Sequence, residues 1–301
     1  MEQGRAFGSC HPVVNFLYFA VVLVYAVGLM HPVSLGISLL SALLYSGMLR
    51  GWRALAQTGK FLLPVSLLAA LLNPLFSHKG TTVLTYFPSG NPLTLESIYY
   101  GLAAAALLAG VLLWFTCWNE VLTAEKILYL FGRVAPALSL LLSMTLSFVP
   151  RFRAQLTRVL QAQRSLRGGE PPKGIRRRLE EGITVLSVLL TWSLENAVET
   201  ADSMKSRGYG LPGRTAFSLY QLDRRDRGLL LWLILCGGGL TAGWAAGGFT
   251  YYYYPSTAGA WGPFPALLFL MELALCLTPV LLEGWEGRRW KNGNRCLSKK
   301  S

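Results

Sequence analysis

The sequence predicts an all-α integral membrane protein with about six transmembrane helices and a cytoplasmic domain of long amphipathic helices. Hydrophobic residues make up 52% of the 301 residues and charged residues only 14%, a composition too apolar for an ordinary soluble domain. Apolar runs near the length of a bilayer span recur six times along the chain. The 28 lysines and arginines gather in a few of the segments between these runs.

The six apolar runs lie at residues 13–30, 33–49, 61–76, 97–117, 229–248 and 264–283. Each approaches the roughly 20 residues that a helix needs to cross the hydrocarbon core of a bilayer. Pro64 falls inside the third run, which is tolerable where neighbouring helices satisfy the freed backbone carbonyl. Residues 1–11 lack the features of a cleavable secretory signal, so we expect the first run to be retained as a span.

The basic residues predict the orientation, because lysine and arginine accumulate in cytoplasmic loops. With the N-terminus inside and six spans, every lysine and arginine except Lys79 lies on the cytoplasmic side. The outer loops carry aromatic residues that suit the membrane interface, such as Tyr86, Tyr99, Tyr100 and the run Tyr251–Tyr254. We therefore expect both termini in the cytoplasm. The net charge of +13 then reflects this topology and not a nucleic-acid partner.

This topology divides the chain into three regions. Residues 1–117 form an N-terminal membrane domain of four spans, 118–227 a cytoplasmic domain, and 228–301 two further spans with a basic tail. From Pro136 to Arg167, apolar residues recur at intervals of three, four or their multiples, as an amphipathic helix requires. These positions are 138, 142, 145, 149, 152, 156, 159 and 166, and all of them are apolar except Thr145. We expect a helix that begins at the membrane, follows its cytoplasmic surface and kinks at Pro150.

A second amphipathic helix is predicted from 183 to 204. Its apolar stripe consists of Ile183, Leu186, Leu190, Leu194, Ala197, Ala201 and Met204, beside a polar row of Glu195, Glu199 and Asp202. Both helices end in an arginine followed by a glycine, and a proline follows each pair within a few residues. The two pairs are Arg167-Gly168 and Arg207-Gly208.

The repeated Arg-Gly pair has two interpretations. Glycine is the favoured residue just past a helix, and arginine in the last turn complements the negative end of the helix dipole. An arginine at a helix tip, with no bulky residue after it, also fits an acidic groove on another protein. The repetition at the ends of two long helices favours docking, with which capping is compatible.

The chain shows no motif of an enzyme. The pattern G-x-x-x-x-G-K-[ST], whose backbone cradles phosphates, does not occur, so we expect no ATP hydrolysis by this chain. The five cysteines stand singly and the three histidines have no H-E-x-x-H spacing, so we expect no metal and no cofactor on this chain. Glu272, midway along the last apolar run, is either a functional group or a hydrogen-bonded packing residue. A stand-alone secondary transporter, a channel and a polytopic membrane enzyme are the alternatives, although obvious inverted repeats are missing.

Six segments carry a family resemblance. They are "MHPVSL" (30–35), "NPLFSHKGTTVL" (73–84), "LTLESIYYG" (93–101), "LFGRVAPALSLLLSMTLSFVPRF" (130–152), "AQRSLRGG" (162–169) and "ADSMKSRGYGLPGRT" (201–215). In this combination and order the chain resembles the transmembrane T component of energy-coupling factor (ECF) transporters, the EcfT/CbiQ family. The resemblance covers nearly the whole chain, and the last segment is the most specific.

The resemblance implies a scaffold in a bacterial-type cell membrane. Such a scaffold couples ATP hydrolysis by two cytoplasmic ABC-type ATPase subunits to movement of a membrane-embedded substrate-binding S component, for uptake of a vitamin or a metal. ATP and Mg would be bound by the ATPase subunits and not by this chain. The substrate would be chosen by the S component, so this sequence does not identify it.

The resemblance also implies roles for particular residues. The second helix would dock an ATPase through Ser206, Arg207 and Gly208, and the first through Arg167 and Gly168. Leu166 departs from the small residue that the family usually has before the first arginine, which affects how closely that tip packs. The S component would contact an apolar surface that includes Leu138, Leu141, Leu142, Met144 and Phe148, although such a stripe is also typical of plain packing.

Overall fold

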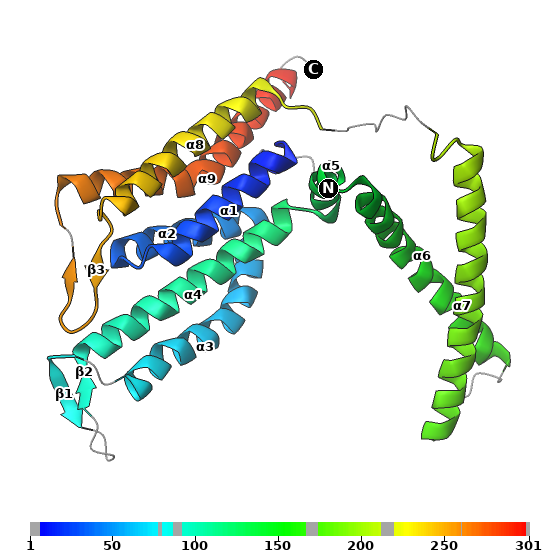
Figure 1. The fold of residues 1–301 in the computed structure, drawn as a ribbon, viewed down its shortest axis with the longest axis horizontal. Coiled ribbons are helices and arrows are strands. Elements are labelled where there is room, and N and C mark those ends of the chain that lie inside the picture. Colours follow the sequence, from blue (N-terminus) through cyan, green and yellow to red (C-terminus); the bar gives the residue numbers. More distant parts are fainter. Residues whose placement is uncertain are drawn as a thin grey trace. The chain divides into compact units, whose positions relative to one another are not determined.

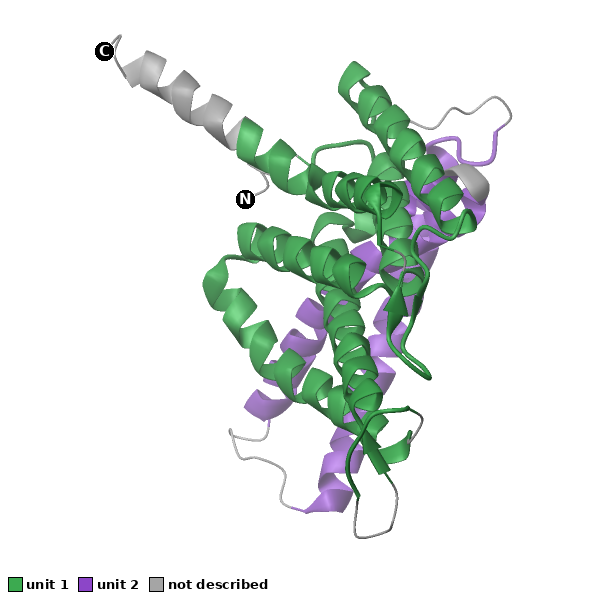
Figure 2. Ribbon diagram, turned by 90° about the vertical axis from the view of Figure 1, so that its left-hand side faces the viewer, with its two compact units in different colours: residues 1–127, 220–301 green, residues 128–219 purple. Residues whose placement is uncertain are grey.

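The computed structural model of the chain describes residues 7–77, 80–86, 92–166, 174–211, 220–259 and 261–298. They belong to two compact units, which Figure 2 shows in different colours. Unit 1 holds residues 1–127 and 220–301, and unit 2 holds residues 128–219. The chain therefore leaves unit 1 once and returns to it once.

The predicted all-helical membrane fold is confirmed. Unit 1 contains the helices α1 (Pro12–Gly28), α2 (Pro32–Arg50), α3 (Trp52–Phe76), α4 (Leu95–Val121), α8 (Arg224–Ala245) and α9 (Pro263–Ser298) (Figure 1). Each of the six predicted apolar runs falls on one of them. In the described part of the chain, five helices are long and apolar enough to cross a membrane, whereas α1 has only 17 residues. The expected six spans thus correspond to five helices of spanning length and one shorter apolar helix.

Proline and histidine set the starts of the first two helices. Pro12 and Pro32 occupy the first helical position, where the missing N–H costs nothing because that donor has no partner inside the helix. His11 and His31 precede them as N-caps, and each Nδ1 accepts a hydrogen bond from the backbone N–H two residues on, at 3.3 Å. Both histidines therefore act as helix caps.

Helix α3 begins nine residues before the predicted apolar run. Gly51, with φ at +80°, ends α2 and lets the chain turn directly into Trp52. The intervening segment contains Arg53 and Lys60, which lower its hydropathy without breaking a helix. Hydropathy therefore marked the part of the helix inside the membrane and missed its first turns.

The core of unit 1 is aromatic and contains polar links between helices. Trp114 of α4 is fully buried and its indole N–H donates to Ser38 of α2 at 3.1 Å. The hydroxyl of Tyr25 in α1 donates to the carbonyl of Gly237 in α8 at 2.7 Å. In an apolar surrounding these donors need protein partners, because no water is present to supply them. The links therefore fix which helices are neighbours.

Two short hairpins, which the sequence analysis did not predict, close unit 1 at one side of the membrane spans. Strands β1 (Val83–Tyr86) and β2 (Pro92–Thr94) pair antiparallel, and so do β3 (Tyr251–Tyr252) and β4 (Ala258–Gly259). The tyrosine run of the second hairpin packs onto the helices: Tyr253 donates to the carbonyl of Met30 at 2.8 Å, and its ring lies 5.4 Å from that of Tyr100. These tyrosines therefore hold the hairpin in place.

Glu272 has a partner that the sequence could not reveal. It is 1% exposed, and Ser34 of α2 donates its hydroxyl to Oε1 of this α9 carboxyl. Within the described residues, Oε2 has no hydrogen-bond partner. The contact supports the interpretation of Glu272 as a hydrogen-bonded packing residue that joins α2 to α9.

Unit 2 is built from two long helices, α6 (Pro136–Leu166) and α7 (Ile175–Ser206), and α5 (Ala124–Val134) leads into it from unit 1. The observed α6 agrees with the predicted helix to within one residue and runs through Pro150 as continuous helix. The helix α7 begins eight residues before the predicted stripe, because its first turns are rich in arginine and glutamate, which favour a helix without being apolar.

Candidate functional site

The C-terminus of α7 is a defined helix stop. Gly208 adopts φ +78°, its N–H donates to the carbonyl of Lys205 at 3.0 Å, and the N–H of Tyr209 donates to that of Met204 at 3.0 Å. This pair of bonds, around a glycine in the left-handed region, is the Schellman motif. It makes Arg207 the C-cap, the residue just after the last helical residue Ser206, with φ −84° and ψ 8°.

The motif places Arg207 at the exposed tip of the helix. Arg207 is exposed, and so is the neighbouring Ser206, whose hydroxyl donates to the carbonyl of Ser203 at 2.9 Å. No ion pair of Arg207 is found among the described residues. The predicted cap is thus present, and it presents a guanidinium group outward as the docking interpretation requires.

Arg167 and Gly168, the first predicted docking pair, lie outside the described residues. The helix that leads to them ends at Leu166, whose side chain is 81% exposed. A large apolar group is therefore uncovered immediately before this arginine. This is where the chain departs from the small residue that the resemblance leads us to expect.

The two long helices are held together by a small apolar core. Val159 of α6 packs with Val185 and Leu189 of α7, and all three are at most 9% exposed. Beside them the rings of Phe148 and Trp192 stack, with centroids 5.5 Å apart and planes at 24°. Phe152, Leu156 and Leu160 of α6 are partly buried against this core.

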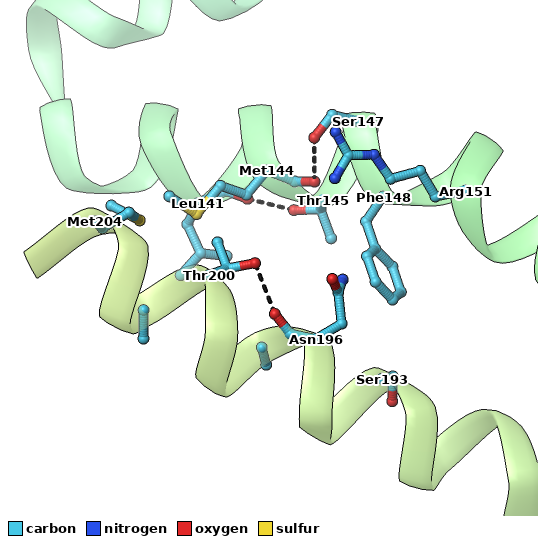
Figure 3. A pocket seen from close by; sticks show the side chains of 12 residues that line it. Leu141, Met144, Thr145, Ser147, Phe148, Arg151, Ser193, Asn196, Thr200 and Met204 are labelled. Carbon is cyan, nitrogen blue, oxygen red and sulfur yellow. Dashed lines mark hydrogen bonds between the residues drawn. The ribbon is translucent and has the colours of Figure 1, made fainter. Parts of the chain in front are cut away.

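Nearer the tip of α7, the helices enclose a groove of about 460 Å³ (Figure 3). Leu141, Met144 and Phe148 of α6 face Asn196 and Met204 of α7 across it. The four hydroxyls at the groove, those of Thr145, Ser147, Ser193 and Thr200, all donate to carbonyls of their own helices; the Ser147 bond to Met144, for example, is 2.9 Å long and the Thr200 bond to Asn196 is 2.7 Å long. The groove is therefore mainly apolar in character.

The five residues predicted to contact an S component divide into two groups. Leu138, Leu141 and Leu142 are 68%, 65% and 45% exposed and form an uncovered patch on α6. Met144 and Phe148 are half-buried and face α7. Leu138, Leu141 and Leu142 therefore form an exposed patch of the kind a partner could contact. Met144 and Phe148 are instead used for packing against α7, which was the competing interpretation.

The apolar stripe predicted for α7 is only partly the packed face. Its first four members, Ile183, Leu186, Leu190 and Leu194, are more than half exposed, whereas Ala197, Ala201 and Met204 line the groove. The buried contacts come instead from Val185 and Leu189, on the adjacent face. The spacing of apolar residues did not predict this, because α7 carries apolar residues on both faces.

No group of three or more histidine, cysteine, aspartate or glutamate side chains that could hold a metal ion is found in the described ranges.

Comparison with known proteins decides the family. Residues 9–217, which include α1 to α7, match the family described as CbiQ, cobalt transport protein. The chain belongs to the CbiQ family. This CbiQ-family chain is a multi-pass membrane transport protein and not an enzyme.

Individual relatives of this CbiQ protein carry a more specific name. A protein of Lactobacillus helveticus (strain DPC 4571), named energy-coupling factor transporter transmembrane protein EcfT, is 31% identical over 114 residues, which cover 38% of this chain and 41% of the relative. A protein of the same name from Exiguobacterium sibiricum (strain DSM 17290) is 33% identical over 102 residues, covering 33% of this chain and 38% of the relative. The chain spans about two fifths of the length of the curated relatives it matches.

Proposed function

We propose that this protein is the transmembrane scaffold, or T component, of an ECF-type importer. In such a complex two cytoplasmic ATPase subunits hydrolyse ATP, and a separate S component in the membrane binds the vitamin or metal ion. The family membership and the name of the two relatives support this function. The observation in the structure that carries it is the Schellman stop, which leaves the guanidinium group of Arg207 exposed at the tip of α7.

The mechanism follows from the helix geometry. Arg207 would enter an acidic groove of one ATPase subunit, and Arg167 would do the same in the other. When the ATPase subunits close on ATP, the tips of α6 and α7 move with them. The patch of Leu138, Leu141 and Leu142 would then shift the S component against which it packs.

The location of the complex is part of the same proposal. We expect unit 2 and both termini in the cytoplasm of a bacterial-type cell, where ATP is available, and the basic residues between the spans support this orientation. Because the S component carries the substrate, the proposal leaves vitamin and metal ion as the two substrate classes.

Isolation from native membranes tests the proposed function. A tagged full-length chain should co-purify with two ATPase subunits and one small membrane protein, and the ligand of the latter identifies the substrate. The chain purified alone and placed in liposomes should not transport that substrate. Transport by the lone chain would instead indicate a stand-alone carrier or channel.

A further inference from the structure

The N-terminal segment Phe7–His11 lies at the point where the chain leaves unit 1 and also at the point where it returns. Lys126, just before the exit, donates through Nζ to the carbonyl of Gly8. After the return, Arg225 donates to Ser9 Oγ at 2.9 Å, and Asp226 Oδ2 accepts the backbone N–H of His11 at 3.3 Å. Both connections to unit 2 are therefore tied to one five-residue segment.

The segment itself is fixed to the membrane helices. Phe7 is 1% exposed, and its ring makes edge contacts with Tyr18 of α1 at 5.0 Å and with Tyr45 of α2 at 6.3 Å between centroids. Cys10 is also 1% exposed and its carbonyl accepts the side-chain amide of Asn15 at 3.4 Å. A strain applied to Gly8–His11 therefore reaches the first two helices of unit 1 directly.

The charges in this cluster match the helix ends that they meet. Lys126 is 8% exposed and also donates to the carbonyl of Val121 at 2.8 Å, so its positive charge lies at the negative end of α4. Asp226 is 4% exposed and lies in the first turn of α8, while its bond to His11 brings the same carboxylate to the start of α1. One buried cation and one buried anion thus join the ends of three helices.

We propose that Lys126 and Asp226 are positioning residues that transmit movement of unit 2 to the membrane helices α1, α4 and α8. This inference rests on the proposed function, because it assumes that ATPase closure moves unit 2. The physical reason is connectivity. The chain passes from unit 1 into unit 2 after residue 127 and returns at residue 220, and a buried charge that loses its partner is costly enough to keep both passages fixed to Phe7–His11.

The test uses the complete complex purified from native membranes, with ATP or with ADP, and measures amide hydrogen exchange by mass spectrometry. In the wild type, ATP should change exchange in α6 and α7 and also at the start of α1, the end of α4 and the start of α8. In Lys126→Met and in Asp226→Ala, the change in α6 and α7 should remain. The change at the three membrane-helix ends should fall about fivefold or more, the lower bound of a typical coupling between two sites.

Two matched variants control for the loss of charge alone. Asp223→Ala removes an exposed carboxylate three residues before Asp226, and Lys60→Met removes an exposed ammonium group from α3. Both should retain the wild-type response at all sites. An unchanged response at the ends of α1, α4 and α8 in Lys126→Met and Asp226→Ala would overturn the inference. A wild type that binds no ATPase, or whose α6 and α7 do not respond to ATP, would instead overturn the proposed function.

A measurement on the wild type covers the case in which neither variant folds. The cluster buries Cys10, to which Arg225 also donates at 3.3 Å, so alkylation of this cysteine reports whether the cluster has opened. If the cluster transmits movement as one body, Cys10 should be equally protected from maleimide with ADP and during ATP turnover. Faster labelling during turnover would show that the cluster opens under load and would refute the inference.

Discussion

The glycine that stops α7 offers a quantitative test of how Arg207 is presented. Gly208→Ala places a side chain at φ +78°, a backbone conformation that costs an L-residue about 1–2 kcal/mol. The new Cβ would also lie 3.1 Å from Cδ1 of Leu211, a flexible side chain that can move aside. The backbone cost therefore dominates, and the helix end shifts toward arrangements that aim Arg207 elsewhere.

The expected effect on docking follows from that cost. If the ATPase subunit binds only the observed conformation of the helix end, the variant must adopt the strained backbone in order to bind. The cost of about 1–2 kcal/mol is then subtracted from the binding free energy, and the affinity falls about 5- to 30-fold. The assay measures the dissociation constant between the purified chain and the ATPase subunits that co-purify with the wild type. Gly208→Asn should lie between wild type and alanine, because asparagine tolerates the left-handed region better.

A second glycine of the same helix supplies the control. Gly174 precedes α7 with φ +94° and open space around it, so Gly174→Ala introduces similar strain at the opposite end. It should leave the dissociation constant unchanged. Wild-type affinity in Gly208→Ala, with the helix otherwise intact by circular dichroism, would show that the cap geometry does not position the docking arginine.

Three further predictions concern packing and reactivity. Leu189→Ala should destabilise the α6–α7 pair by about 2–4 kcal/mol, because Leu189 is buried, whereas the same substitution at its exposed neighbour Leu190 should cost less than about 1 kcal/mol. Equal susceptibility of the two variants to limited proteolysis would contradict the buried contact. Glu272→Ala removes the acceptor of the Ser34 hydroxyl and should lower the stability of the detergent-solubilised chain by about 0.6–2 kcal/mol, whereas Glu272→Gln should retain most of the wild-type stability. Equal melting temperatures of the wild type and Glu272→Ala would argue against the bond. Burial raises the pKa of the Cys10 thiol to about 11, so the reactive thiolate is scarce at pH 8 and the rate of alkylation should increase with pH up to about pH 11. Alkylation of the folded chain at pH 8 as fast as that of the unfolded chain would refute this.

The sequence predicted those features whose physical signal is local. Hydropathy located the membrane helices, and three- and four-residue spacing located α6 and α7. The glycine at 208 predicted the helix stop that the Schellman bonds confirm. Each of these signals needs only neighbouring residues to be read.

The features that the sequence did not predict depend on contacts between distant residues. Ser34 and Glu272 are 238 positions apart, and His11 and Asp226 are 215 apart, so no local pattern connects them. The choice of Leu189 over Leu190 as the buried residue of α7 likewise depends on where α6 lies. The spacing of apolar residues in a sequence shows that a helix has apolar faces, but not which of these faces a neighbouring helix covers.

The central claim is that the arginines at the two helix tips dock the ATPase subunits, and the double variant Arg167→Ala/Arg207→Ala tests it most directly. Substrate uptake by the reconstituted complex is measured together with membrane insertion, and Lys205→Ala, an exposed basic residue two positions before Arg207, serves as the control. The double variant should insert normally, lose coupling to ATP more completely than either single variant, and differ from a fully active control. Uptake by the double variant at the wild-type rate would contradict the claim.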